Sequence, residues 1–118
     1  MSFDVFAAAN EWRFRVDGDV VAVPIRPRLI VSTAEAAIDA AIAGVGITCV
    51  LSYQVEAALR SGLLVLLMRQ SELPPIPVSF LYASQGRLPL KLRALLDFAG
   101  PRLRARLRRS ETILSRSL

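Results

Sequence analysis

One stretch in the middle of the chain, residues 28–51, constrains the fold more than any other. Residues 29–31 form a short apolar run rich in β-branched side chains, which is typical of a buried strand. Ser32 followed by Glu35 fits a capping box, and apolar residues then recur at helical spacing. Residues 46–51 form a second apolar run. The pattern predicts a strand–helix–strand crossover in which the two strands run parallel.

Polar side chains follow each of the two predicted strands. Ser32 and Thr33 follow the first strand, and Ser52 and Tyr53 follow the second. In open α/β sheets, ligands bind at the carboxyl ends of strands, where helix N-termini carry unpaired amide groups. If the two strands are neighbours, these four side chains share one rim that suits a small anion or carboxylate. The alternative, in which the Ser and Thr residues only cap helices, stays open.

The composition favours one domain with an apolar core. The chain has 118 residues, of which 53% are hydrophobic, and no window contains the ~18 consecutive apolar residues that a membrane span needs. The N-terminus lacks a basic segment followed by an apolar core, so we expect no secretory signal and a cytoplasmic location. Cys49 is the only cysteine, which excludes an internal disulfide, and its place in an apolar run predicts a buried, inert thiol.

The net charge of +5 is concentrated at the C-terminal end. Residues 87–118 carry nine Arg or Lys side chains against Asp97 and Glu111, which gives +7 there and −2 for residues 1–86. An arginine-rich segment of this kind can contact nucleic acid, chiefly through residues 102–109. It also fits a solvated helix face, which we favour because no aromatic residues alternate with the arginines.

The rest of the chain alternates predicted strands and helices. Apolar and basic residues alternate at 12–16, and a turn at 17–19 leads to a second run at 20–25, which predicts a hairpin. The remaining expected elements are strands at 63–68 and 78–82, a proline-rich extended connector at 72–77, a helix at 54–60, and a helix at 91–107 that Gly100 and Pro101 weaken or kink. Gly44 and Gly62 are expected to end the two earlier helices.

Catalytic and metal chemistry find little support in the sequence. The chain has no histidine, which removes Ser–His and Cys–His nucleophile pairs and the commonest zinc ligand. No phosphate-binding GxxxxGKS/T loop occurs, and Gly44-Val45-Gly46 is only a fragment of GxGxxG at a helix end. The carboxylate pairs Asp17/Asp19 and Glu35/Asp39 have no companion residues for a metal or acid–base site. We therefore expect no enzyme activity, no cofactor and no bound metal.

A series of short motifs follows in register over residues 12–107. The motifs are Trp12-x-Phe14, Arg28-Leu29-x-Val31, Ala36-Ala37-x-x-Ala40-Ala41-x-x-Gly44-x-Gly46-Ile47, Leu59-x-Ser61-Gly62-x-Leu64-Val65, Val78-x-Phe80-Leu81-Tyr82 and Leu88-Pro89-x-Lys91-x-Arg93-Ala94-x-x-Asp97-Phe98. Taken together, this series resembles the effector-binding domain of LysR-type transcriptional regulators.

The resemblance implies an α/β fold of the type II periplasmic-binding-protein-like kind, with a mixed, mostly parallel sheet flanked by helices. In the family, a small effector binds in a cleft between two lobes, and a separate N-terminal winged helix-turn-helix domain reads DNA. This chain resembles the second lobe and the segment that returns to the first, so the two-lobe domain is incomplete. DNA would then be contacted only through the missing helix-turn-helix domain. Whether the chain is an excised piece or a truncated gene product stays open.

The resemblance also divides the chain and suggests its site. The expected parts are the second lobe at 12–73, a connector and return strand at 74–84, the C-terminal helix of the first lobe at 88–109, and a frayed tail at 110–118. The family's effector contacts fall on Ser32, Thr33, Leu51, Ser52 and Tyr53. The family commonly has proline directly after the second strand, where this chain has Ser52, so the local backbone is expected to differ. A carboxylate-like effector would bind weakly, because half a cleft leaves ligand surface in water.

The missing lobe also predicts self-association. The strand at 78–82 and the helix at 89–107 would pack on elements that the chain lacks, so we expect a homodimer, one form of which exchanges the C-terminal helices. Two alternatives for the function remain. One is a dimerisation module that modulates a full-length regulator without sensing a ligand, and the other is a basic nucleic-acid-binding protein that acts through residues 102–109.

Overall fold

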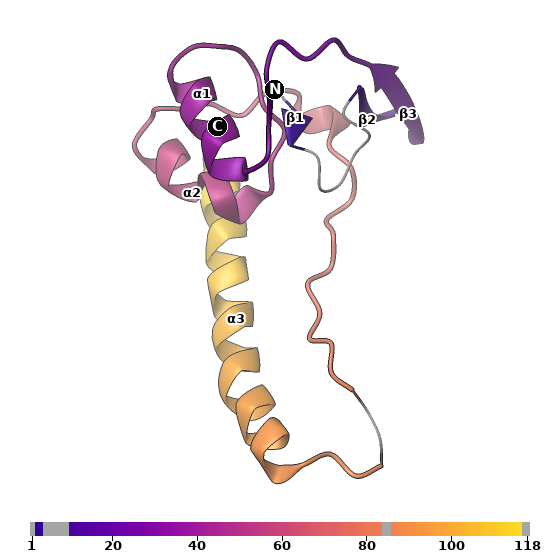
Figure 1. The fold of residues 1–118 in the computed structure, drawn as a ribbon, viewed down its shortest axis with the longest axis vertical. Coiled ribbons are helices and arrows are strands. Elements are labelled where there is room, and N and C mark those ends of the chain that lie inside the picture. Colours follow the sequence, from indigo (N-terminus) through magenta and orange to yellow (C-terminus); the bar gives the residue numbers. More distant parts are fainter. Residues whose placement is uncertain (1, 4–9, 84–85, 117–118) are drawn as a thin grey trace.

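The structure, a computed structural model, describes residues 2–3, 10–83 and 86–116 of the chain. Short strands dominate the N-terminal part of the chain and helices the remainder (Figure 1). In chain order the described elements are β1 (Ser2–Phe3), β2 (Glu11–Val16), β3 (Asp19–Pro24), β4 (Ile30–Val31), α1 (Ala34–Ile42), α2 (Ser52–Arg60), the 3₁₀ helix η1 (Arg69–Ser71) and α3 (Leu90–Arg116). Among these residues, no helix is long and apolar enough to cross a membrane.

The hairpin formed by β2 and β3 confirms the prediction from the alternating pattern. The two strands pair antiparallel, from Glu11 opposite Pro24 to Val16 opposite Asp19. Asp17 and Gly18 connect them with φ angles of 52° and 91°, both positive as a type I′ turn requires. This turn matches the right-handed twist of the strands, so the local sequence suffices to fix the hairpin.

The predicted parallel pairing between residues 29–31 and 46–51 is wrong. β4 does form at the first position, but its parallel partner is β1, with Ser2 opposite Ile30. Residues 46–51 form no strand, and neither do residues 63–68 or 78–82. The described sheets are therefore one parallel and one antiparallel pair, which does not bear out a mostly parallel sheet. The physical reason is that an apolar run becomes a strand only where another backbone pairs with it.

Helix α1 begins one residue later than the capping box predicts. Thr33, not Ser32, is the N-cap residue, and its Oγ1 accepts a hydrogen bond of 3.2 Å from the amide of Ala36. The helix ends in a Schellman motif, in which the amide of Val45 donates to the carbonyl of Ala40 at 3.0 Å. Gly44 supplies the left-handed residue that this motif needs, with φ of 80°, as the sequence predicts.

Helix α2 follows the same design with a different N-terminal cap. The backbone amide of Leu51 donates to Oε1 of Gln54 at 3.0 Å, so a side chain from the first turn reaches back over the helix start. At the other end, the amide of Leu63 donates to the carbonyl of Ala58 at 3.0 Å, and Gly62 has φ of 71°. The helix therefore starts two residues before the predicted Gln54 and ends at the predicted Arg60, shortly before Gly62.

A small apolar core lies where the three helices meet. Ile38 of α1 and Val55 and Leu59 of α2 are buried against one another. Four partly buried side chains pack on them, namely Val50, Leu64, Leu66 and, from the end of α3, Leu114. We call α1, α2 and residues 110–114 of α3 the packed end. It holds the buried apolar side chains among the described residues.

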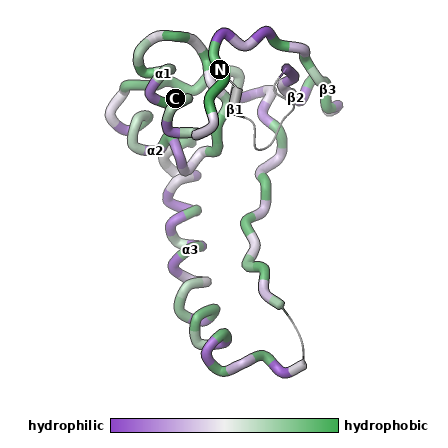
Figure 2. Tube along the Cα trace, viewed as in Figure 1, coloured by the Kyte–Doolittle hydropathy of each residue, from purple (hydrophilic) through white to green (hydrophobic). Residues whose placement is uncertain are grey.

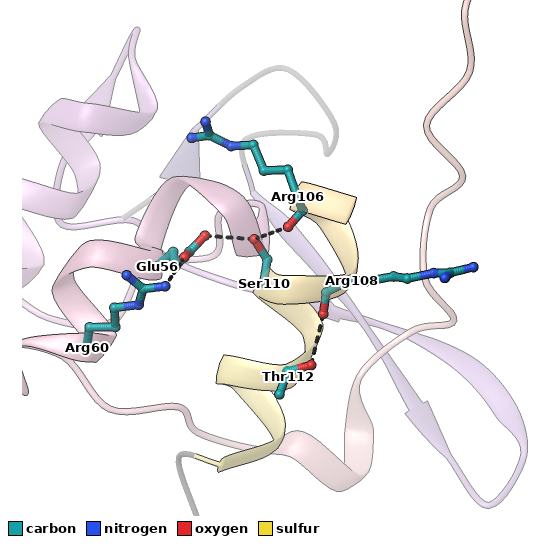
Figure 3. A network of polar contacts seen from close by, with 6 residues as sticks. All are labelled: Glu56, Arg60, Arg106, Arg108, Ser110 and Thr112. Atoms are coloured by element: carbon teal, nitrogen blue, oxygen red, sulfur yellow. Dashed lines mark hydrogen bonds and ion pairs between the residues drawn. The ribbon is translucent and has the colours of Figure 1, made fainter. Parts of the chain in front are cut away.

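The C-terminal part of α3 is fastened to α2 by polar contacts as well (Figure 3). Ser110 is only 3% exposed, and its hydroxyl donates a 2.7 Å hydrogen bond to Oε2 of Glu56. The guanidinium of Arg60 lies 2.8 Å from the other oxygen of the same carboxylate. The expected frayed tail at 110–118 is thus wrong as far as Arg116, because these contacts hold the helix in place. The helix also continues through Pro101, where the sequence predicts weakening.

The first part of α3 and the segment before it project away from the packed end. Figure 1 shows residues 72–83 and the N-terminal half of α3 as the two sides of an elongated projection, which we call the arm (residues 72–83 and 86–100). The Cα radius of gyration is 17.3 Å, against about 13.5 Å for a compact domain of this length. Apolar residues are frequent along the arm (Figure 2), yet many of their side chains are exposed.

Candidate functional site

The five residues singled out from the sequence lie at the N-terminal ends of α1 and α2. Ser32 and Thr33 precede α1, and Thr33 caps it. Leu51 holds the N-cap position of α2, and Ser52 and Tyr53 are the first residues of that helix. The two helices contact each other. The structure therefore places both groups at helix starts. Ser32 also follows the strand β4, whereas the second strand expected at residues 46–51 does not form.

The hydroxyl groups of this site fall into two groups, one that caps a helix and three that make no internal hydrogen bond among the described residues. Thr33 Oγ1 is occupied by the cap hydrogen bond to the Ala36 amide. Among the described residues, the hydroxyls of Ser32, Ser52 and Tyr53 make no hydrogen bond to the rest of the chain. These three residues are exposed, and Leu51 is half-buried beside them. Three hydroxyls are thus free for a ligand and one is committed to structure.

The two helix starts differ in their charge. Helix α1 has Glu35 in its first turn, and this carboxylate already complements the positive end of the helix dipole. Helix α2 has no acidic residue in its first turn. An anion therefore meets less repulsion at the amides of Ser52 and Tyr53 than at the start of α1. The start of α2 is the better anion site of the two.

Two residues just before α2, Thr48 and Cys49, have surroundings that the sequence did not predict. Thr48 Oγ1 is buried without a hydrogen-bond partner among the described atoms, and its only sequence signal is a hydroxyl inside an apolar run. Cys49 is exposed, so the expectation of a buried thiol is wrong. Its surroundings nevertheless remove enough water to raise the pKa of the Cys49 thiol, which keeps it protonated and poorly reactive.

A shallow hollow lies elsewhere, at the open end of the hairpin. It has a volume of about 560 Å³ and is lined by Asn10, Pro24, Ile25, Arg26 and Pro27. None of the five predicted site residues lines it. The candidate site at the two helix starts is formed by exposed residues and the half-buried Leu51. Among the described residues, no group of three or more potential His, Cys, Asp or Glu metal ligands gathers.

The arginines of α3 between positions 102 and 109 are all exposed. Arg102 is engaged within its own helix, because its guanidinium carbon lies 3.6 Å from the centre of the Phe98 ring and Nη1 donates to the Phe98 carbonyl at 2.8 Å. The others lie on the helix surface, as expected for a solvated face. This region contributes no residue to the site at the helix starts.

Comparison with known proteins gives one finding. The family described as the LysR substrate binding domain matches residues 6–104, well over half of the chain. No curated protein and no solved structure matches the chain significantly. The matched range includes all five candidate residues and ends within α3.

Proposed function

Because the chain belongs to the family of LysR substrate-binding domains, we propose that it binds a small anionic effector at the starts of α1 and α2 and serves in transcription regulation. The family consists of regulators, which accounts for the absence of recognisable catalytic motifs. The effector's carboxylate would accept hydrogen bonds from the first amides of α2 and from the Ser52 and Tyr53 hydroxyls, with Ser32 at the edge. We place the protein in the cytoplasm, where such a regulator has access to DNA.

One observation carries this proposal: the first turn of α2 offers free hydroxyls and amides without a competing acidic residue. Ser52 and Tyr53 are exposed there, Ser32 and Thr33 are exposed at the start of α1, and the two helices contact each other. The site covers only one side of a ligand. We therefore expect weak binding, because much of the ligand surface stays in water.

Thermal stabilisation by a panel of small mono- and dicarboxylates tests the proposal. A ligand that binds only the folded state raises the melting temperature with increasing concentration. Ser52→Ala and Ser32→Ala remove hydroxyls that make no internal hydrogen bond, so the unliganded proteins should melt unchanged while the ligand-induced shift falls. Ser61→Ala, at the opposite end of α2, is the control. Its hydroxyl donates to the carbonyls of Ala57 and Ala58, so the unliganded variant should melt earlier, but the full ligand-induced shift should remain. An equal shift in all three variants would place the ligand elsewhere.

We further propose that the protein is a homodimer. The support is the arm, whose exposed apolar side chains include Leu81 at 94%, Leu90 at 84% and Ile76 at 64%. The N-terminal half of α3 is amphipathic, with Leu92, Leu95, Leu96 and Ala99 along one stripe, a pattern that suits a helix whose apolar face is covered by a neighbour. A second copy can supply those neighbours, and exchange of the C-terminal helices is one way of doing so.

Analytical sedimentation measures this association directly. At tens of micromolar we expect a species of twice the 12.9 kDa chain mass. Phe80→Asp places a charge on the arm and should shift the species to the monomer. Ala36→Asp adds the same charge at an exposed site in the first turn of α1 and should leave the dimer intact. A folded wild-type monomer at this concentration would refute the dimer.

A further inference from the structure

Residues 76–82 of the arm have the pattern of a strand, but none of the described strands pairs with them. Ile76, Val78, Phe80 and Tyr82 alternate with Pro77, Ser79 and Leu81, so one face of an extended segment would carry apolar side chains of β-branched and aromatic type. All four are exposed. In the part of the chain that the structure describes, no backbone hydrogen bond joins residues 73–83 to any other residue.

The prolines of the arm make the two edges of this segment different. In an extended chain, the N–H and C=O groups of alternate residues point to opposite edges. Pro75 and Pro77 lie on the odd-numbered edge and have no N–H to donate. The even-numbered edge keeps the amides of residues 76, 78, 80 and 82. Only that edge can form a continuous ladder over the whole segment.

The exposed apolar area of the arm is large enough for a stable interface. Nine large apolar side chains between positions 73 and 98 are 40–94% exposed. At ~200 Å² for a large side chain, they leave roughly 1,000 Å² uncovered on each chain. Summed over the two segments of the arm, this area compares with the ~800 Å² per partner that a standard interface buries. The arm alone therefore carries the area that one side of a dimer needs.

We propose that residues 76–82 pair antiparallel with the same residues of a second copy, about a two-fold axis that passes at Ser79. This inference rests on the proposed homodimer and specifies how it forms. The even-numbered edges face each other, so each hydrogen-bonded pair exchanges two N–H···O bonds. Ile76 lies opposite Tyr82 of the second copy, and Val78 lies opposite its Phe80. Every cross-strand pair on the apolar face thus joins a β-branched side chain to an aromatic one, a favourable combination.

Neighbouring registers satisfy fewer groups. A shift that places Ile76 opposite Phe80 brings Tyr82 opposite Pro74, which cannot donate a hydrogen bond. The opposite shift leaves Ile76 beyond the paired segment. A shift by an odd number of residues pairs the even-numbered edge of one chain with the odd-numbered edge of the other, which breaks the two-fold symmetry and brings Pro77, which has no N–H, into the ladder. The register centred on Ser79 is therefore the one that uses all four donors.

A disulfide at the axis tests this register. At Ser79 the two chains would form a non-hydrogen-bonded pair with Cα atoms about 4.5 Å apart. That separation lies inside the ~4.4–6.8 Å range of disulfides. Ser79→Cys is made in a Cys49→Ser background, which leaves one thiol per chain. Ala83→Cys in the same background is the matched control, because its two thiols would lie ~27 Å apart along the ribbon.

Under mild oxidation, the Ser79→Cys protein should form the covalent dimer at least ~10-fold faster than the Ala83→Cys protein, because pairing raises the effective thiol concentration. Equal rates together with a dimer in sedimentation would overturn the strand pairing but leave the homodimer standing. Equal rates together with a monomer would overturn both, and would mean that a different chain covers the arm. Faster cross-linking through position 83 would also contradict the register.

Discussion

The packed end and the arm contain the same kinds of apolar residue, but these side chains are buried at the packed end and exposed in the arm. At the packed end, Leu59 is 9% exposed, and it belongs to a cluster with residues of α1, of α2 and of the end of α3. In the arm, Leu81 is 94% exposed. The contrast shows that apolar content does not by itself make a core, because a core needs elements that can face one another. The described elements form one small core, and the apolar side chains of the arm stay exposed.

The largest expected effect comes from deleting a side chain at the packed end. Leu59→Ala should lower the free energy of unfolding by about 3 kcal/mol, the sum of lost burial and the cavity left behind. Leu81→Ala removes the same atoms in the arm and should change it by less than ~0.5 kcal/mol for the monomer. Urea titration at low protein concentration compares them. Similar losses of unfolding free energy in the two variants would contradict the difference in burial between the packed end and the arm.

A smaller effect is expected where α3 is fastened to α2. Ser110→Ala removes the hydrogen bond to the Glu56 carboxylate and should cost about 1–2 kcal/mol of unfolding free energy. Thr112→Ala is the control, since that exposed hydroxyl donates to the carbonyl of Arg108 in its own helix at 3.0 Å (Figure 3). We expect Thr112→Ala to change stability by less than ~0.5 kcal/mol. A greater loss in the control than in Ser110→Ala would count against the fastening role.

The cap of α1 gives a third comparison, within one helix start. Thr33→Ala removes the acceptor for the Ala36 amide and should cost about 1 kcal/mol. Ser32→Ala, one residue earlier, removes a hydroxyl without an internal partner and should be nearly neutral. Thermal unfolding of both variants without ligand measures the difference. The reverse order would restore the capping box first predicted from Ser32 and Glu35.

The smallest effect concerns thiol reactivity in the two regions. Partial burial raises the pKa of the Cys49 thiol, whereas a cysteine placed at the exposed Ala83 of the arm should titrate near the ordinary ~8.5. Alkylation rates followed against pH should therefore rise later for Cys49. The pKa of the Cys49 thiol is higher in the folded protein than in the unfolded chain. The thiol's contribution to the free energy of unfolding is therefore fully present at pH values below the ordinary thiol pKa, and it is lost as the pH rises through the raised pKa. Coincident profiles would contradict the burial effect.

The features predicted correctly from the sequence are those that neighbouring residues determine. Asp17-Gly18 fixes the hairpin turn through its positive φ angles, and Gly44 and Gly62 end α1 and α2 in the same way. The apolar spacing of the two helices marks their inner faces, with Ile38 and Leu59 buried as expected. Each of these choices involves only a few consecutive residues, so the information is local.

The features predicted wrongly depend on distant parts of the chain. Residues 46–51 and 78–82 have strand-like sequences, but no composition rule says whether a pairing backbone exists. The sequence after position 109 predicts a frayed tail, because the hydrogen bond that holds Ser110 is made to Glu56, which lies 54 residues earlier. For the site, the sequence predicted the N-cap of α1 one residue early and the start of α2 two residues late, so the difference between the two starts required the observed helix boundaries.

Residue-resolved amide hydrogen exchange of the full chain, at a concentration where it sediments as a dimer, tests most directly whether a second copy completes the arm. The account predicts alternation along the segment: the amides of Val78 and Phe80 are protected by cross-strand hydrogen bonds, while those of Ser79 and Leu81 exchange rapidly. Exchange of all four amides at the rate of an unstructured peptide would contradict it.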